Sequence, residues 1–205
     1  MKSAVTKQNV NVEEYLDLES KSRRKHEFID GDVLLMAGAS RRHSKIASNI
    51  GGELFGQLKG TDCEVHYGDL SIRVRPTHYV YGDFSVFCGE PEIEKYKDAE
   101  TLLNPRVVFE VLSRSTEARD RGEKAQDYRQ LASLTDYFFV SQDKISVEHY
   151  VRQNDNSWKL IEYRELDDEI RLSGIKCTLK VKDIYNGVEL PKLRLVECLQ
   201  ATILN

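Results

Sequence analysis

Residues 106–112, with the sequence R-V-V-F-E-V-L, limit more than any other segment what this chain can fold into. The run is almost continuously apolar and too short for most helices, so it predicts a strand that is covered on both faces. Residues 117–131 follow with a helical pattern that Ser115 or Thr116 can cap, and residues 137–140 have the pattern of another buried strand. A strand, a helix and a strand in this order favour a crossover connection between parallel strands.

Patterns on either side of this unit predict further helices and hairpins. The expected elements are a short helix capped by Asn11, a hairpin of residues 26–29 and 32–37 around Asp30-Gly31, a helix from the cap Ser40 to about Leu58, two or three strands between Cys63 and Cys88 with turns near Gly68 and Pro76, an exposed loop or short helix over residues 89–100, and a hairpin of residues 145–151 and 158–163. In the helix after Ser40, Gly51 and Gly52 either weaken the helix or mark a close approach to another element. Together these patterns predict an α/β (mixed α+β) fold, in which a mixed central sheet is flanked by helices and carries additional β-hairpins.

The length and composition indicate one globular unit. The chain has 205 residues, of which 40% are hydrophobic and 31% are charged, so we expect a single domain over residues 1–205 and not a disordered chain. The longest apolar run, residues 33–37, is far shorter than the ~20 residues that a membrane-spanning helix needs. The N-terminus also lacks the apolar core of a signal peptide, so the sequence predicts a cytoplasmic protein with no membrane partner.

The acidic net charge hides an uneven distribution. The formal charge is −4, but residues 90–100 carry −3 and residues 162–169 carry −4, which leaves +3 for the rest of the chain. A basic face is compatible with the acidic total, because the field near a cleft depends on local charge. The candidates for a phosphate-binding rim, which could equally be a plain solvated face, are Arg23, Arg24, Lys25, Arg41, Arg42 and Lys45.

The four cysteines do not form a recognisable motif. They are Cys63, Cys88, Cys177 and Cys198, and no two of them have the C-x-x-C spacing of a zinc site or a redox site. We expect them to be reduced thiols that pack as small apolar side chains.

Glu110 is the residue of the buried run that most needs a partner. An ionised carboxylate inside a core strand is costly unless it is paired, protonated or bound to a metal ion. Lys124 and Tyr128 lie one turn apart on the following predicted helix and can face the sheet on the same stripe. Asp83, in a strand pattern upstream, and Glu27, in the first hairpin, are further acids that could lie close by.

Two interpretations explain such a group of residues. Two carboxylates on adjacent strand ends suit Mg²⁺ or Mn²⁺, and a nearby lysine can stabilise charge or help to deprotonate a water, which together are what phosphodiester hydrolysis needs. In the other interpretation, Glu110 forms a structural ion pair with Lys124 or an arginine, because ion-pair networks also perturb carboxylates. The residues alone leave both interpretations open.

Longer stretches of the sequence resemble a known family. They are H-E-F-I-D-G-D-V-L-L-M-A-G-A-S-R-R-H (26–43), G-D-F-S-V-F (82–87), V-F-E-V-L-S-R-S-T (108–116), D-R-G-E-K-A-Q-D-Y-R (120–129), L-A-S-L-T-D-Y-F-F-V-S-Q-D (131–143) and V-E-H-Y (147–150). In this order they are similar to the Uma-type restriction endonucleases of the PD-(D/E)XK nuclease superfamily, over residues 11–190. The resemblance implies a restriction-endonuclease-like fold with a four- or five-stranded mixed core sheet, and a Mg²⁺- or Mn²⁺-dependent endonuclease that acts on DNA.

The resemblance also implies site residues by position. Asp83 and Glu110 would bind the metal ion, and Lys124 would act from the following helix. Gly82 stands where the family has a proline, and Leu112 stands where the lysine usually lies, two residues after the acid. Proline supplies no ligand, and a long lysine side chain can reach the site from a helix. The catalytic set implied in this way is Glu27, which would assist, Asp83, Glu110 and Lys124.

Weaker candidates surround this set. His43 is either a structural histidine or a contact to phosphate, and Tyr128 is either a core residue or a support for Lys124 or a phosphate. The residues that are more simply helix caps or solvated surface are Ser113, Ser115, Thr116, Asp120 and Arg121.

The leading hypothesis from the sequence is a Mg²⁺-dependent endonuclease that hydrolyses DNA phosphodiester bonds. The alternative is a non-catalytic module that binds nucleic acid or protein, in which the same acids form only a core ion pair. Hydrolysis of another phosphate ester on the same scaffold is a third hypothesis, because a fold does not fix its substrate. A homodimer would suit cleavage of both strands of a duplex.

Overall fold

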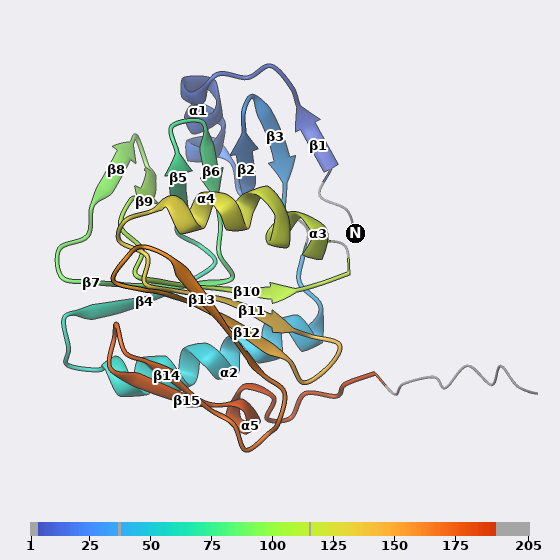
Figure 1. Cartoon of the computed structure of the whole chain (residues 1–205). Helices are drawn as coiled ribbons and strands as arrows, with labels where there is room; N and C mark the ends of the chain where they lie inside the picture. Colours follow the sequence, from blue (N-terminus) through green and yellow to red (C-terminus); the bar gives the residue numbers. More distant parts are fainter. Residues whose placement is uncertain (1–3, 37, 115, 192–205) are drawn as a thin grey trace, which may run out of the picture.

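The fold is described from a computed structural model, which gives residues 4–36, 38–114 and 116–191 (Figure 1). The strands form a six-stranded sheet, a seven-stranded sheet and a separate two-stranded ribbon. This mixed α/β architecture confirms the predicted fold class, and the six-stranded central sheet is larger than the four or five strands expected. That residues 1–205 form one domain stays a prediction.

The central sheet is built around the buried run that dominates the sequence. Its strand order is β13-β12-β11-β10-β7-β4. The bounds are β4 (Cys63–Tyr67), β7 (Phe84–Cys88), β10 (Val107–Leu112), β11 (Asp136–Ser141), β12 (Val147–Arg152) and β13 (Trp158–Tyr163). Strands β10 and β11 pair in parallel and the other pairs are antiparallel, which confirms the predicted crossover. Every residue of β10 is buried, because helices cover both faces of this strand.

The two faces of β10 pack against different helices (Figure 1). Phe109 and its alternate neighbours lie in the cluster with α2 (Arg41–Leu58), and Val108 lies in the cluster with α4 (Ala125–Gln130). Because side chains alternate along a strand, Glu110 points to the same face as Val108. The acid therefore faces the segment that carries Lys124.

The segment after β10 is a broken helix and not the single helix predicted over 117–131. It consists of α3 (Glu117–Arg119), a π-helical turn η1 (Asp120–Lys124) and α4. Gly122 has φ −87° and ψ −121°, a conformation outside the helical region that glycine reaches at low cost. Thr116 precedes α3 without a capping hydrogen bond from its side chain, and Ser115 lies outside the described residues. The segment is therefore two short helices joined by a kink at Gly122.

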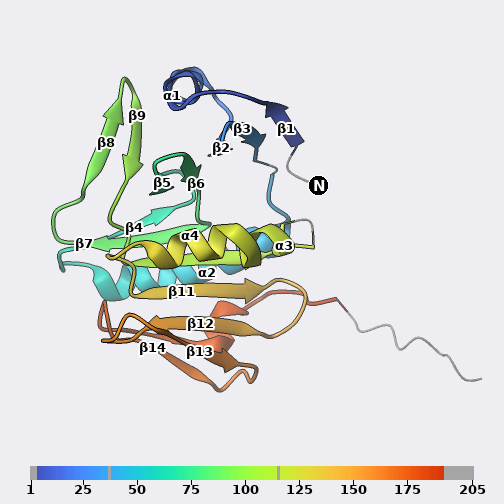
Figure 2. The same ribbon diagram turned by 45° about the horizontal axis from the view of Figure 1, so that its top comes forward.

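The seven-stranded sheet lies on the α4 side of the central sheet (Figure 2). Its order is β1-β3-β2-β6-β5-β9-β8, with bounds β1 (Ala4–Lys7), β2 (His26–Ile29), β3 (Asp32–Leu35), β5 (Ser71–Arg75), β6 (His78–Val80), β8 (Ile93–Tyr96) and β9 (Ala99–Leu102). Helix α1 (Val12–Lys21) has the predicted Asn11 cap and packs Tyr15 against Phe28. Positive φ angles at Asp30 (43°) and Gly31 (97°) form the predicted turn between β2 and β3.

Three predicted segments differ from the structure. The stretch from Cys63 to Cys88 holds four strands and not two or three, because short polar turns divide it further. Residues 89–100, expected to be a loop or a short helix, contain β8 and the start of β9, and Lys97 with φ 53° makes the turn. Strand β3 ends at Leu35, and residue 37 of the predicted strand lies outside the described residues.

The C-terminal part of the described chain contains three elements that were not predicted. They are β14 (Glu169–Leu172), β15 (Cys177–Lys180) and α5 (Val181–Ile184). Their apolar residues, such as Leu172 and Ile184, join the cluster of α2 and cover this helix from outside. Helix α2 matches the prediction from its Ser40 cap to Leu58. Gly51 is where this helix closely approaches β4, since a Cβ at this position would lie 2.3 Å from the Tyr67 hydroxyl.

The prediction of four reduced cysteines is wrong for one pair. Cys63 on β4 and Cys88 on β7 form a disulfide, because the antiparallel register places them directly opposite each other. Cys177 is a buried free thiol, as expected, and Cys198 lies outside the described residues. The two cysteines are 25 residues apart in the sequence, so no local spacing motif indicated the pair.

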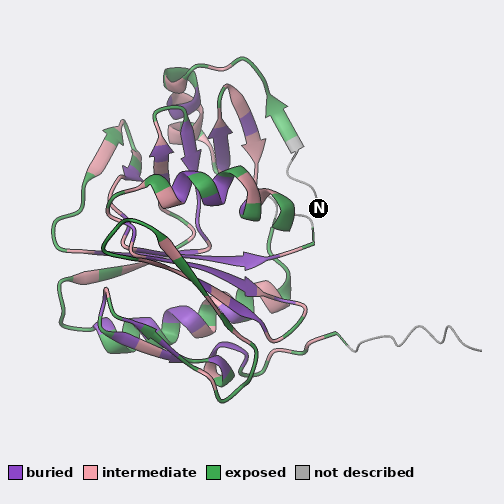
Figure 3. Ribbon diagram, in the orientation of Figure 1, coloured by how far each residue is buried: buried purple, intermediate pink, exposed green. Residues whose placement is uncertain are grey.

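Buried residues concentrate in the central sheet and on the inner sides of α2 and α4 (Figure 3). Among the described residues, none of the helices combines the length and the apolar character that crossing a bilayer requires. Charged residues are rarely buried without a partner, so the buried ones indicate where a site could lie. Several of them lie close together between α4, β10 and the β2–β3 hairpin.

Candidate active site

A cavity of about 460 Å³ lies at the carboxyl end of β10. Five charged residues from distant parts of the sequence line its inner part: Glu27, Asp83, Glu110, Asp120 and Lys124. All four residues predicted to be catalytic are in this set. His43, a weaker candidate, also lines the cavity.

Lys124 lies at the centre of these groups. Its Nζ atom is 2.8 Å from Glu110 Oε1, 3.2 Å from Glu27 Oε1 and 3.8 Å from Asp120 Oδ1. It also donates a hydrogen bond of 2.7 Å to the carbonyl oxygen of Tyr81. Burial alone would lower the pKa of Lys124, but the three carboxylates hold it well above the usual lysine range. The side chain is therefore a protonated ammonium group whose position is fixed from several directions.

Glu110 is the least satisfied acid of the site. Its Oε1 atom is buried and pairs with Nζ of Lys124 at 2.8 Å, an ammonium group that it shares with Glu27 and Asp120. Burial raises the pKa of Glu110 well above its usual value, the nearby Asp120 and Asp83 raise it further, and Lys124 offsets only part of this effect. Removing a carboxylate from water without full pairing is costly, so this position favours a proton or an additional cation.

Asp83 lies immediately before β7 and is tied to β10. Its backbone N–H donates to the carbonyl of Phe109 (3.0 Å), and its Oδ2 atom accepts from the N–H of Val111 (2.7 Å). Its Oδ1 atom lies 2.8 Å from Nε2 of His43 on α2. Burial would lower the pKa of His43, but the contact with Asp83 raises it overall. These contacts hold the Asp83 carboxylate beside the strand that carries Glu110.

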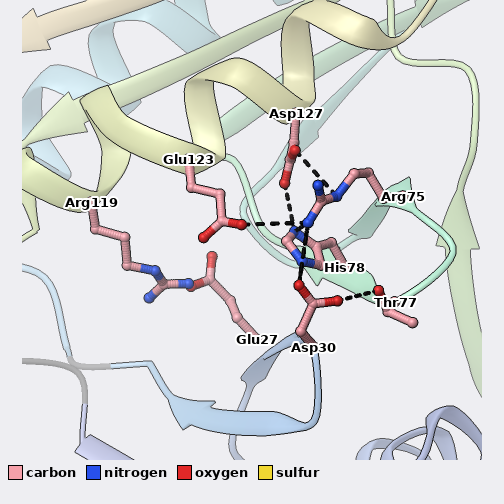
Figure 4. Close-up of polar contacts among 8 residues, drawn as sticks. All are labelled: Glu27, Asp30, Arg75, Thr77, His78, Arg119, Glu123 and Asp127. Atoms are coloured by element: carbon pink, nitrogen blue, oxygen red, sulfur yellow. Dashed lines mark hydrogen bonds and ion pairs between the residues drawn. The ribbon is translucent and has the colours of Figure 1, made fainter.

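Glu27 has more partners than Glu110. It is buried on β2, accepts a hydrogen bond from the backbone N–H of Tyr81 (3.2 Å), and forms ion pairs with Lys124 and Arg119. Figure 4 shows Arg119 and Glu27 pointing toward each other from the broken helix and the hairpin. Burial would raise the pKa of Glu27, but these two cations and the backbone donor lower it overall. Glu27 is thus an ionised carboxylate that orients Lys124.

Asp120 belongs to the site although it was not predicted to be catalytic. The expectation that it belongs to solvated surface is wrong, because it is only 7% exposed and lines the cavity. Burial raises its pKa, and Lys124 partly offsets that shift. Its distance of four residues from Lys124 was an available signal, because residues at this spacing share one side of a helix. Arg119, which pairs with Glu27, was not singled out either.

The other sequence candidates have different positions. Tyr128 is completely buried in the apolar cluster of α4 and is not among the residues lining the cavity, which favours the core interpretation. Leu112 belongs to the same cluster. A Cβ atom at Gly82 would lie 2.9 Å from Cγ1 of Val108, so this chain has no room for a larger residue unless Val108 shifts. Ser113 and Thr116 both line the cavity.

The charges in the inner cavity do not balance. Four carboxylates, those of Glu27, Asp83, Glu110 and Asp120, surround the cavity together with the permanently charged Lys124 and Arg119. With all four acids ionised, these six side chains sum to −2 before any charge on His43 is counted, and Arg42, Arg114 and Asp143 bring the whole lining of the cavity to −1. The three acids that do not pair with Arg119 are candidate ligands of a divalent cation by their chemistry, but among the described residues the ligand atoms that lie within 4.8 Å of one another are those of Asp30, His78 and Glu123. Carboxylate oxygens are the ligands that Mg²⁺ and Mn²⁺ prefer.

A second group of possible ligands lies beside the pair of Arg119 and Glu27, between the broken helix and the hairpin of β2 and β3 (Figure 4). Ligand atoms of Asp30, His78 and Glu123 lie within 4.8 Å of one another. The Nη2 atom of Arg75 lies 2.6 Å from His78 Nε2, 3.3 Å from Asp30 and 3.4 Å from Glu123. A guanidinium group therefore already contacts all three residues, and Asp127 holds the other ring nitrogen of His78 at 2.5 Å. This arrangement is an ion-pair network that links the seven-stranded sheet to the helix of the site.

Two curated proteins are similar to most of this chain. The uncharacterized protein slr1290 of Synechocystis is 36% identical over 177 residues, which is 86% of this chain and 91% of the relative. The uncharacterized protein sll1609 of the same organism is 31% identical over 166 residues, or 80% of this chain and 92% of the relative.

A solved structure has the same fold. A crystal structure from Anabaena variabilis, described as a "putative nuclease belonging to DUF820", covers 86% of this chain and 97% of its own chain, with a TM-score of 0.66 and 18% identity. The model of the Uma2 family, described as "Putative restriction endonuclease", matches residues 12–182 and so includes every residue of the inner cavity. The chain therefore belongs to the Uma2 family and has its restriction-endonuclease-like fold.

Proposed function

We propose that the protein is a Mg²⁺- or Mn²⁺-dependent endonuclease that hydrolyses phosphodiester bonds of DNA. The observation that carries the proposal is Glu110, a buried acid with a raised pKa that shares the ammonium of Lys124 with Glu27 and Asp120, in a cavity whose acids outnumber its cations. A purely structural acid would be expected to have full pairing, as Glu27 does. The family description and the name of the solved relative support the same class of reaction.

Asp83, Glu110 and Asp120 would hold the metal ion. When bound, a divalent cation would neutralise charge on the phosphoryl group and on the leaving oxygen. His43 and the N–H of Val111 keep the Asp83 carboxylate oriented toward the cavity. Ligands fixed in this way need little rearrangement, which favours binding.

Lys124 would stabilise negative charge on the phosphate. Its raised pKa keeps the ammonium protonated at neutral pH, so the group is suited to hydrogen bonding and charge stabilisation and poorly suited to removing a proton from water. Glu27 and the carbonyl of Tyr81 would position the ammonium without touching the substrate. Glu27 is therefore a positioning residue in this proposal.

Nicking of supercoiled plasmid tests the proposal. We expect the wild-type protein to nick plasmid with Mg²⁺ or Mn²⁺ and not with EDTA, and both Glu110→Gln and Lys124→Met to lower the rate at least about 100-fold. Glu123→Gln is the matched control, because this exposed glutamate precedes Lys124 but does not line the cavity. Activity that survives in Glu110→Gln, or no nicking by micromolar wild-type protein with either metal ion, would contradict the assignment.

The second candidate function is a non-catalytic nucleic-acid-binding or protein-interaction module. The three carboxylates around Lys124 favour it, since they could form a core ion-pair network without a metal ion. Calorimetry with Mn²⁺ separates the two functions, because only the nuclease requires a metal site that Glu110→Gln weakens. The homodimer and the cytoplasmic location stay predictions.

A further inference from the structure

A second cavity adjoins the candidate active site. It has a volume of about 570 Å³ and shares Arg42 with the active-site cavity. We call it the α2 groove. Its lining residues are Arg41, Arg42, Ser44, Lys45, Ser48, Gly187, Val188 and Glu189.

The α2 groove has two walls that are fixed to each other. One wall is formed by the first two turns of α2 and the other by the segment after α5. The Asn49 amide donates hydrogen bonds of 2.9 Å to the carbonyls of both Ile184 and Asn186, which holds the second wall in place. At Gly187, with φ 68°, a Cβ atom would lie 3.4 Å from Cε of Lys45. The groove is therefore part of the packed structure.

The charge of the α2 groove is positive. Three basic side chains line it against the single acid Glu189. Arg42 pairs with Asp143 at 3.3 Å at the rim of the active-site cavity. Within the described ranges, Arg41 and Lys45 are exposed and have no acidic partner within 4 Å. Two of the three cations are thus available for an anionic ligand.

Helix stability does not explain these cations. The first turn of α2 contains no acidic residue, and basic residues at a helix N-terminus are unfavourable for the helix dipole. Acids at these positions would stabilise the helix, so the observed residues indicate another role. The serine hydroxyls of Ser44 and Ser48 add hydrogen-bond donors on the same side of the helix.

We propose that the α2 groove binds phosphates of the DNA strand next to the phosphodiester bond in the active site. This inference rests on the proposed function for its substrate. The inner cavity is negatively charged and suits a cation, whereas the adjoining groove is positively charged and suits the backbone. Arg42 lines both cavities, so one strand could extend from the groove into the site past this side chain. Contacts to phosphates position the strand and carry no sequence information.

The double variant Arg41→Glu/Lys45→Glu tests the groove. Glutamates near a helix N-terminus are favourable, so the variant should fold, and its thermal unfolding should match or exceed that of the wild type. Binding of a fluorescent DNA duplex is measured by anisotropy in EDTA, which prevents cleavage, over a range of salt concentrations. We expect affinity to fall at least about tenfold and the slope of log K against log salt to become shallower by about 2, because about two phosphate contacts are lost.

Lys59→Glu/Lys159→Glu is the matched control. It makes the same change in net charge at exposed lysines outside both cavities, on the far end of α2 and on β13. Equal loss of affinity in both double variants, or wild-type affinity and slope in Arg41→Glu/Lys45→Glu, would overturn the groove as the DNA site.

Hydrolysis measurements separate this inference from the proposed function. Bis(p-nitrophenyl) phosphate is too small to reach the groove, so Arg41→Glu/Lys45→Glu should hydrolyse it at the wild-type rate. The KM of the same variant for plasmid should rise. If the wild type cleaves plasmid and the groove variant has an unchanged KM, the groove inference is wrong and the nuclease stands. If the wild type cleaves nothing but binds DNA through the groove, the groove is supported and the nuclease is wrong.

Discussion

The two buried glutamates of the candidate site should respond in opposite directions when each loses its charge. Glu27 has two cationic partners and a backbone donor, and its pKa is lowered. Glu110 shares one ammonium group, has other acids nearby, and its pKa is raised. Glutamine keeps the size of both side chains. In metal-free protein at pH 8, we expect Glu27→Gln to be destabilising and Glu110→Gln to be neutral or stabilising.

The magnitudes follow from the partners that remain. Glu27→Gln leaves Arg119 without its carboxylate and weakens the pairing of Lys124, and loss of one partner of a buried ion pair costs about 3–5 kcal/mol. Glu110→Gln leaves Lys124 with Glu27 at 3.2 Å and the Tyr81 carbonyl at 2.7 Å. Each tenfold rise in the proton affinity of the folded-state Glu110 costs about 1.4 kcal/mol of stability at higher pH, and the glutamine variant avoids this cost.

The pH dependence has a different sign for the two acids. A raised pKa means that the folded protein binds the proton more tightly, so the wild-type free energy of unfolding should fall as pH rises from about 4.5, the unfolded value of Glu110. Glu110→Gln should lack this decrease. The pKa of Glu27 is lowered in the folded protein, so Glu27 contributes to the free energy of unfolding at pH above its unfolded-state pKa. This contribution is lost as the pH falls through its folded-state pKa.

Urea unfolding in EDTA between pH 5 and pH 8 measures these differences, and constant m values would show that the unfolding transition is comparable. Mn²⁺ at 100 times its dissociation constant should then stabilise the wild type by about 2.7 kcal/mol and leave Glu110→Gln unchanged. If Glu110→Gln is as destabilising as Glu27→Gln at every pH, and Mn²⁺ stabilises neither protein, the pair of Glu110 and Lys124 is structural and the reasoning is refuted.

Three further outcomes are expected. Lys124→Met should cost about 3–5 kcal/mol in metal-free protein, because three carboxylates lose their shared cation, and urea unfolding with Mn²⁺ should show part of this loss restored. Asp120→Asn should lower the Mn²⁺ affinity measured by calorimetry about tenfold or more, whereas Asp30→Asn, in the Arg75 network, should leave it unchanged. Gly82→Ala should lower the free energy of unfolding by about 1–3 kcal/mol, because its Cβ would lie 2.9 Å from Val108; a wild-type melting curve for this variant would contradict the close packing.

The central part of the fold could be predicted because its signals are local. The apolar run of β10, the Asn11 and Ser40 caps and the Asp30-Gly31 turn each act over a few residues, and the structure contains all of them. The break at Gly122 could not be predicted in this way. A glycine inside a helical pattern is usually tolerated, and its conformation here depends on how the segment packs against two sheets.

The sequence predicted most residues of the candidate site but not the ion pairs between them. A lone acid in an apolar strand identified Glu110, the strand and helix patterns around it indicated Lys124, Asp83 and Glu27 as partners, and the family resemblance implied their roles. Asp120 lies in the polar start of the helix, where only its distance to Lys124 distinguished it from surface acids. The pairing of Arg119 with Glu27 joins residues 92 positions apart, so no local pattern could reveal it.

The position of Lys124 on a helix has a consequence for how such proteins diverge. Leu112 belongs to the apolar cluster, so the acid and the amine lie on separate elements, and their spacing depends on how α4 packs on the sheet through Ala125 and Tyr128. Exchanging one aliphatic residue in that layer could move the amine away from its target while every polar group is preserved. A relative with such an exchange would keep every polar residue of the motifs, so a comparison of motifs alone would not detect the displaced amine.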